Sequence, residues 1–384
     1  MSAVALLALA WATLLPAAVE AQEPTEGFSG EAELYSRLLG HVAAYGGEAE
    51  MQDNASWIGL NVSAGSTIRM FGGVEWQINI FQNDRLFNPG ASTDGEFGLT
   101  TREVNAFGLR VGFVGIDLGA VGSLALGKQK SVHYDVAGYT ADRLNVFGGG
   151  VGSIAYPASS DGGETGTGRA DQALIYRNTL LDIVEVGVQT QFQNATNDRV
   201  VDGAGASARV RILPGLHLGA SYTRSFYGDA FRDAVSGLAI DDDGQYFAVG
   251  GRYEADRFEV GAVYARQDNG DLVGVPGTTS TDPGEVPLAF DAEGLEVVGK
   301  FRFGPFALLG GYVGYDPDTD DPRVDDDYRV RYGVLGGEWH PTDNAYAYVE
   351  FRGDDSRDAT GTRGDDVLAI GFYYGFRALF EHGR

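Results

Sequence analysis

Segments in which apolar and polar residues alternate one by one recur along most of the 384 residues of this chain. A period of two is the pattern of a β-strand whose two faces meet different surroundings. Residues 67–80 are an example, since every second position from Ile68 onward is apolar except at a glycine. Most of the positions between them carry polar or charged residues, such as Arg69 and Glu75. The alternation therefore predicts an all-β protein.

A soluble β-sandwich also alternates, but the strand lengths and connections favour a barrel in a membrane. Many candidate strands reach about ten residues, the length that a tilted strand needs to cross a bilayer. Short turns alternate with long acidic connections, as in outer-membrane barrels. The short turns fall at 214–215, 255–256, 304–305 and 341–343, and the acidic segments at 228–244, 316–327 and 352–366. Sixteen candidate strands between Glu31 and Phe376 predict a transmembrane antiparallel β-barrel.

The first 21 residues, MSAVALLALAWATLLPAAVEA, match a cleaved export signal, because an apolar stretch precedes the residues Val19 and Ala21 at the expected cleavage site. No other stretch is long and apolar enough to form a transmembrane helix. The net charge of −26 argues against nucleic acid as a partner, since phosphate binding needs a basic surface. We expect a signal peptide at 1–21, one undivided barrel at 22–376 and a C-terminal tail at 377–384.

The faces opposite the apolar ones are expected to line a water-filled lumen. An arginine at the bilayer midplane costs about 2–4 kcal/mol, so a barrel keeps its arginines on the lumen side. One interpretation is that these side chains pair with lumen acids and stabilise the wall; the other is that several line a constriction and act on passing solutes. The basic residues assigned to lumen faces are Arg37, Arg69, Arg110, Arg169, Arg177, Arg209, Arg211, Arg252, Lys300, Arg302, Arg329, Arg331 and Arg352.

Four motifs follow one another between Leu109 and Asn178: LRVGFVG, then VHYD at the end of a strand, then YTADRLNVFGG, and then GRADQALIYRN. In this order they resemble motifs of the general, non-specific trimeric porins of Gram-negative outer membranes. ELYSRLLG near the start and DDVLAIGFYYGF near the end also fit that family's pattern. The resemblance implies a homotrimeric channel in the outer membrane that admits small hydrophilic solutes passively and uses no cofactor.

The resemblance also implies that residues 131–167 form a loop that folds into the lumen and narrows it. The tip of this constriction loop is expected at Phe147, Gly148 and Gly149, where glycines permit a tight turn. The family's basic cluster falls on Arg37, Arg110 and Arg169, and its first loop acid falls on Asp142. Further pore-lining candidates are Trp57, Arg69, Glu75 and Asn145.

Two charged positions of the family are not matched by charged residues. One basic position falls on Trp57, and the second loop acid falls on Asn145 or Val146. Each side of the expected filter therefore lacks one charge, so we expect only weak charge selectivity. The acidic outer loops are expected to enrich cations at the mouth of the channel. The last strand is expected to end on the aromatic residue Phe376, although RALFEHGR follows it.

Motifs for catalysis or metal binding are incomplete. GSLALGKQ nearly matches a phosphate-binding loop, but Gln129 replaces the required hydroxyl residue. The acidic segment 316–327 lacks the glycine and closing glutamate of a calcium loop, and the five histidines show no paired ligand spacing. We therefore expect no enzyme and no metal site.

Two alternatives to a general porin remain. The arginine-rich wall also fits a substrate-specific channel for phosphate or another anion, and a plugged barrel with acidic loops would suit a structural or adhesive protein of the envelope. Expected partners are further copies of the chain, outer-membrane lipid and lipopolysaccharide, and small hydrophilic solutes.

Overall fold

The computed structural model describes residues 29–54, 56–80, 85–87, 99–101, 107–147, 163, 165–192, 200–228, 242–276, 285–318, 324–357 and 361–382. The expected signal peptide and the glycines Gly148 and Gly149 lie outside these residues. No helix of the described chain is long and apolar enough to cross a membrane.

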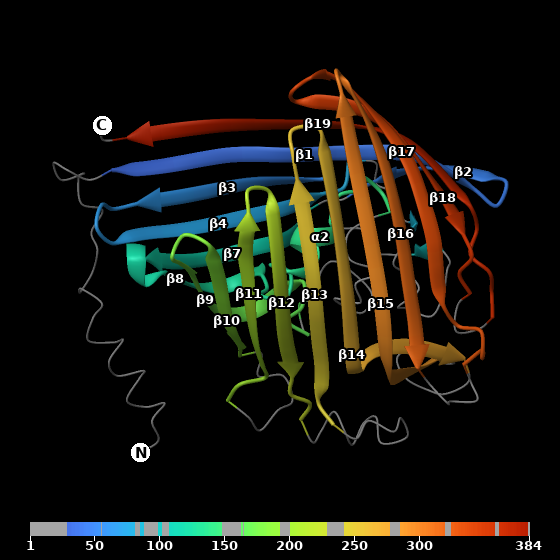
Figure 1. Ribbon diagram of the computed structural model, residues 1–384, viewed down its shortest axis with the longest axis horizontal. Coiled ribbons are helices and arrows are strands. Elements are labelled where there is room, and N and C mark those ends of the chain that lie inside the picture. Colours follow the sequence, from blue (N-terminus) through green and yellow to red (C-terminus); the bar gives the residue numbers. More distant parts are fainter. Residues whose placement is uncertain are drawn as a thin grey trace.

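Antiparallel strands that follow one another in sequence form one continuous wall (Figure 1). Its strands are β1 (Gly30–Tyr45), β2 (Glu48–Asp53), β3 (Trp57–Ala64), β4 (Arg69–Ile78), β7 (Phe107–Asp117), β8 (Ser123–Lys130), β9 (Arg169–Leu180), β10 (Val184–Gln191), β11 (Gly203–Leu213), β12 (Leu216–Ser225), β13 (Gly244–Glu254), β14 (Phe258–Pro276), β15 (Glu285–Phe303), β16 (Phe306–Asp318), β17 (Val330–Thr342), β18 (Ala345–Asp354) and β19 (Val367–His382). Other elements of the described chain are not strands of this wall. They are the pair β5 (Arg85–Phe87) and β6 (Leu99–Thr101), the turn η2 (Gly119–Val121) and the helix α2 (Ala137–Ala141).

The wall contains sixteen transmembrane strands, as the sequence predicts, because β2 and β3 are two parts of one strand. Both pair with β1, which binds β2 along Gly40–Tyr45 and β3 along Gly30–Arg37. The break between them falls at residues 54–56. Of the two parts, β2 lies near the long loops and β3 lies near the short turns.

The barrel closes through β1 and β19, which lie side by side in Figure 1. Their antiparallel pairing runs from Gly30 with His382 to Ala44 with Leu368. The boundary expected at Phe376 therefore falls inside the last strand, because residues 377–382 hydrogen-bond with the beginning of β1. This pairing leaves no open edge in the wall, which is the condition for a β-sheet to cross a bilayer.

The two ends of the barrel differ, as the alternation of short and long connections predicts. We call them the turn end and the loop end. At the turn end, β11 and β12 are joined at residues 214–215, where Gly215 has a φ of +81°. A Cβ on Gly215 would lie 2.1 Å from the carbonyl oxygen of Glu254, so only glycine fits this turn. The described residues that flank the long acidic segments, such as Asp243 and Asp316, lie at the opposite end.

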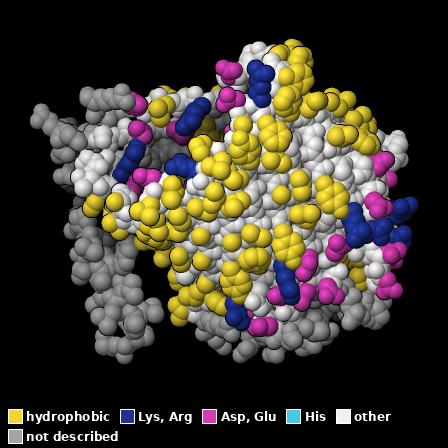
Figure 2. Space-filling model, in the orientation of Figure 1, with side chains coloured by type: hydrophobic (Ala, Val, Ile, Leu, Met, Phe, Trp, Pro, Cys, Tyr) yellow, Lys and Arg dark blue, Asp and Glu magenta, His cyan; other side chains and the backbone are white. Residues whose placement is uncertain are grey.

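The outer face of the wall is apolar and the inner face carries the buried charges. Leu335 in β17 is 71% exposed, whereas Glu338 of the same strand and Glu350 of β18 are buried inside. Figure 2 shows apolar side chains spread over the outer wall, with charged side chains toward its margins. This distribution is the reverse of that in a soluble protein and fits contact with hydrocarbon.

The lumen assignment of Arg331 is wrong. Its neighbours Val330 and Tyr332 occupy the inward positions, so the alternation of β17 turns Arg331 outward near the loop end. There its guanidinium group forms an ion pair of 2.6 Å with Asp316.

A charge placed on the outer face should destabilise the barrel. We expect Leu335→Arg to lower the free energy of unfolding by about 2–4 kcal/mol, because the guanidinium group enters hydrocarbon. Val121→Arg, in an exposed turn, should change it by less than about 1 kcal/mol. Equilibrium urea unfolding in lipid vesicles measures both values, and equal effects of the two changes would contradict the outward orientation of Leu335.

Candidate functional site

Residues 131–147 leave the end of β8 and run along the inner wall of the barrel. The backbone N–H of Val132 donates a hydrogen bond of 3.1 Å to the side chain of Gln189 in β10. The carboxylate of Asp135 accepts two hydrogen bonds, of 2.8 and 3.3 Å, from Arg177 in β9. These contacts join the loop to side chains that point inward, so this part of the loop lies in the lumen.

The helix α2 continues this path and packs against β13 and β14. The carbonyl oxygen of Thr140 lies 2.4 Å from the position that a Cβ on Gly261 would take, so glycine allows the close approach. The ring of Tyr139 lies under the guanidinium groups of Arg209 and Arg252, at 3.7 and 5.0 Å from its centroid. Several of the lumen arginines therefore hold the loop as well as the wall.

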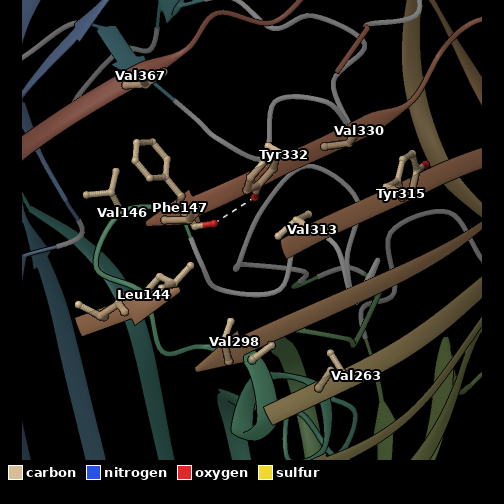
Figure 3. Packing of buried hydrophobic residues seen from close by; sticks show 14 of the residues in the cluster. Leu144, Val146, Phe147, Val263, Val298, Val313, Tyr315, Val330, Tyr332 and Val367 are labelled. Atoms are coloured by element: carbon tan, nitrogen blue, oxygen red, sulfur yellow. Dashed lines mark hydrogen bonds between the residues drawn. The ribbon is translucent and has the colours of Figure 1, made fainter. Parts of the chain in front are cut away.

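The described part of the loop ends in an anchor on β17 and β18. One carboxylate oxygen of Glu350 accepts a hydrogen bond of 2.6 Å from the N–H of Asn145. The other oxygen accepts from the N–H groups of Val146 and Phe147, at 2.8 and 3.4 Å. The hydroxyl of Tyr332 donates to the carbonyl oxygen of Phe147 at 3.0 Å (Figure 3).

Apolar contacts complete the anchor. Phe147 is fully buried, so its ring packs against the wall and does not project as a loop tip. Figure 3 shows the loop residues among apolar side chains of the wall. The cluster includes Leu144, Val146 and Phe147 from the loop, and Val263, Val298, Val313, Tyr315, Val330, Tyr332 and Val367 from the wall.

Asn145 belongs to the anchor and has little contact with water. It is 7% exposed, and its amide nitrogen donates to Glu338 and Glu350 at 3.1 and 3.0 Å. Its amide oxygen accepts from the hydroxyl of Tyr346 at 2.8 Å. Its carbonyl oxygen accepts from Asn54, at the break between β2 and β3, so the anchor also reaches the strand next to β1.

Three arginines predicted to form the basic side lie together. Arg110 points inward at a β-bulge, where the register of β4 and β7 shifts. Its guanidinium group donates a hydrogen bond of 3.2 Å to Glu75 and lies 5.9 Å from the ring centroid of Trp57. Arg37 and Arg169 both lie within electrostatic range of Arg110. The cluster thus combines residues from β1, β7 and β9.

The predicted acid, Asp142, lies just after α2 and faces this cluster through Tyr134. The hydroxyl of Tyr134 donates a hydrogen bond of 2.7 Å to Asp142. Burial and the charge of Asp142 raise the pKa of Tyr134, so the hydroxyl stays protonated. Arg110 and Arg169 lie within electrostatic range of this tyrosine.

The candidate Arg69 lies elsewhere, and two neighbours of the cluster are not among the predicted site residues. Arg69 pairs with Glu31 at 2.5 Å, near the turn end. Lys130, the last residue of β8, has its ammonium nitrogen 4.7 Å from the ring centroid of Tyr134. Both Lys130 and Tyr134 lie within the stretch that carries the family motifs. This place in the sequence is the one feature that could have indicated a role for them in the site.

Comparison with known proteins identifies the family. The model of the family described as Gram-negative porin matches residues 94–376. The chain belongs to this family. Outer membrane protein F of Serratia marcescens is 27% identical over 336 residues, which cover 81% of this chain and 82% of that protein. Outer membrane porin N of Escherichia coli K12 is 26% identical over 337 residues, covering 79% and 80%.

Solved structures share the fold. An OmpF of Salmonella typhi in complex with daunomycin superposes with a TM-score of 0.65 at 22% identity, covering 90% of this chain and 97% of that one. The trimer form of OmpT from Vibrio cholerae gives a TM-score of 0.61 at 16% identity, covering 90% and 99%. The porin is thus an integral channel of the outer membrane, as the sequence predicts, and its relatives are channels and not enzymes.

Removing the carboxylate of the anchor should free the loop. Glu350→Ala leaves buried N–H groups without an acceptor, at a cost of about 1–3 kcal/mol. We expect trypsin to cleave this variant after Arg143 faster than it cleaves the unmodified porin. Asp343→Ala, in an exposed turn, should leave the cleavage rate unchanged. An equally resistant Glu350→Ala protein would show that Glu350 does not hold the loop.

Proposed function

We propose that this porin is a passive, water-filled channel for small hydrophilic solutes and ions, without catalysis or a cofactor, and that residues 131–167 narrow it. The observation that carries the proposal is the path of the loop. Its described part starts at β8, is held by Gln189 and Arg177, and ends at Glu350 on the far part of the wall. A segment held at both ends across the lumen reduces the open cross-section.

The filter of this channel would lie between the loop and the basic cluster. Arg37, Arg110 and Arg169 form its basic side, and Asp142 forms its acidic side. Tyr134 lies between the two sides and fixes the carboxylate of Asp142 by a hydrogen bond. Charges held at fixed positions in a narrow lumen act strongly on passing ions.

The working form would be a homotrimer in outer-membrane lipid and lipopolysaccharide. The trimer form of OmpT from Vibrio cholerae supports this assembly, since it shares the fold. The exposed apolar outer wall supplies the surface for lipid and for neighbouring copies.

A channel specific for an anion is the second candidate, and the cluster of three arginines favours it. A saturable conductance that a competing anion blocks would distinguish this candidate from a general porin. A structural or adhesive role for a plugged barrel would require a closed lumen.

Conductance in a planar bilayer tests the main proposal. The purified porin should insert in discrete current steps in potassium chloride, and the step size should rise with salt concentration because ions pass through water. A monomer by native mass measurement would contradict the trimer alone. An absence of current steps from folded protein would contradict the open channel and favour the plugged barrel.

Neutralising the loop acid should change ion selectivity. We expect Asp142→Asn to raise the permeability of chloride relative to potassium by about two- to fivefold, as for the loss of one partly exposed charge. The control Asp343→Asn removes a charge at an exposed turn and should have little effect. Zero-current potentials in a salt gradient measure both variants, and an unchanged ratio in Asp142→Asn would remove this residue from the filter.

A further inference from the structure

Four aromatic side chains form a diagonal row on the inner wall, between the level of the constriction and the turn end. They come from β1, β3, β4 and β7, which are neighbours in the wall (Figure 1). All four side chains are partly exposed, and they occupy inward positions of their strands. We call them the aromatic row, which consists of Trp57, Tyr35, Phe113 and Phe71.

The strand register places these residues in steps. Trp57 lies opposite Arg37, and Tyr35 lies two residues nearer the turn end on β1. Phe113 of β7 and Phe71 of β4 follow at the next two inward positions in the same direction. Two residues of a strand span about 6.6 Å, so the row extends about 20 Å along the strands. Each inward level of this part of the wall therefore carries one aromatic ring.

Three of the rings lie over glycines of the neighbouring strand. A Cβ at Gly115 would lie 2.5 Å from the ring of Phe71, and a Cβ at Gly73 would lie 2.9 Å from the ring of Phe113. Because glycine has no side chain, each ring can lie close to the wall and keep one side toward the lumen. The pairs are Tyr35 with Gly59, Phe113 with Gly73 and Phe71 with Gly115.

Hydrogen-bonding groups lie beside the rings. The hydroxyl of Tyr35 donates to the carboxylate of Glu75 at 3.2 Å. At the next inward level, the side-chain amide of Asn61 donates to Glu33 at 3.2 Å. A carboxylate has about four lone-pair sites, so both acids can accept further hydrogen bonds. This part of the lumen thus combines ring surfaces with hydrogen-bond acceptors.

A row of rings is unusual on a surface that faces water. The interior of a porin is polar, and its aromatic residues belong mainly to the lipid interfaces. An aromatic ring over a glycine also stabilises a sheet, but this role requires no order from one level to the next. Contiguous apolar groups among a few polar ones are the usual lining of a binding site.

We propose that the aromatic row binds linear oligosaccharides as they pass between the constriction and the turn end. A sugar ring has a flat face of C–H groups, which packs on an aromatic ring and buries apolar surface. The hydroxyl groups at its edge donate to acceptors such as Glu75 and Glu33. The site rests on the proposed function, because the sugar must enter the lumen to reach it.

Sugar block of the ion current tests the proposal. Potassium chloride current through the full-length porin in a planar bilayer is recorded while maltotriose, a short chain of glucose units, is added on both sides. We expect a saturable reduction of the current. Phe113→Leu should weaken the apparent affinity by about three- to tenfold, because leucine is apolar but has no flat face. Phe113→Tyr, which keeps the ring, should retain the affinity.

The matched control is Phe107→Leu on the outer face of the same strand. Phe107 is 66% exposed on the side away from the lumen, so its loss should change the apparent affinity by less than about twofold. Sorbitol is the control solute, because it carries hydroxyl groups on an open chain without a flat ring face. It should lower the current only in proportion to its concentration.

Equal effects of Phe113→Leu and Phe107→Leu would overturn the proposal. A current that falls with maltotriose without saturating would also overturn it, and this result needs no variant, so it decides the matter even if Phe113→Leu fails to fold. Saturable block by free tryptophan but not by maltotriose would assign the row to planar aromatic solutes and reject oligosaccharides. Ordinary current steps in potassium chloride would meanwhile leave the proposed channel function intact.

Discussion

The structure depends on one requirement, which is that every backbone N–H and C=O group in hydrocarbon must find its hydrogen-bond partner within the protein. Pairing of β1 with β19 meets this requirement by removing both edges of the sheet. Closure then imposes an inside and an outside on each strand, and the alternation of the sequence follows from it. Leu335 faces outward and Glu338 faces inward for this reason, although they are only three residues apart on β17.

The enclosed space is lined by two kinds of surface, and the loop uses each in turn. Its first part meets polar and charged groups such as Gln189 and Arg177, and its last described part meets apolar residues of β14 to β19. Buried charge is tolerated along this path because each group has partners, as the three N–H groups around Glu350 show. The loop is therefore a folded part of the interior, and its position sets the distance between Asp142 and the arginines.

Local pattern was enough to predict the wall, because strands, turns and face assignment depend on neighbours in sequence. It failed at Arg331 near the beginning of β17, where the apolar residues Val330 and Tyr332 face the interior, and at the boundary drawn at Phe376. The interior was harder to predict. The bond between Val146 and Glu350 joins residues 204 positions apart, and no local signal reveals such a pair. Arg110 was found through its motif. Lys130 did not match a charged position of the family, and its place beside Arg169 is visible only in the pairing of β8 with β9.

The carboxylate of Glu350 holds the loop mainly through backbone N–H groups, and this affects how the loop can evolve. At Val146 and Phe147 the carboxylate accepts only from the peptide nitrogens, so it does not recognise which side chains these two residues carry, whereas it also binds the side chain of Asn145. Substitutions at 146 and 147 can therefore accumulate as long as the cavity beneath them is filled. Proline is the exception, because it has no N–H to offer. Variation of these two buried residues is therefore independent of the hydrogen bonds that hold the loop, and those bonds exclude only proline.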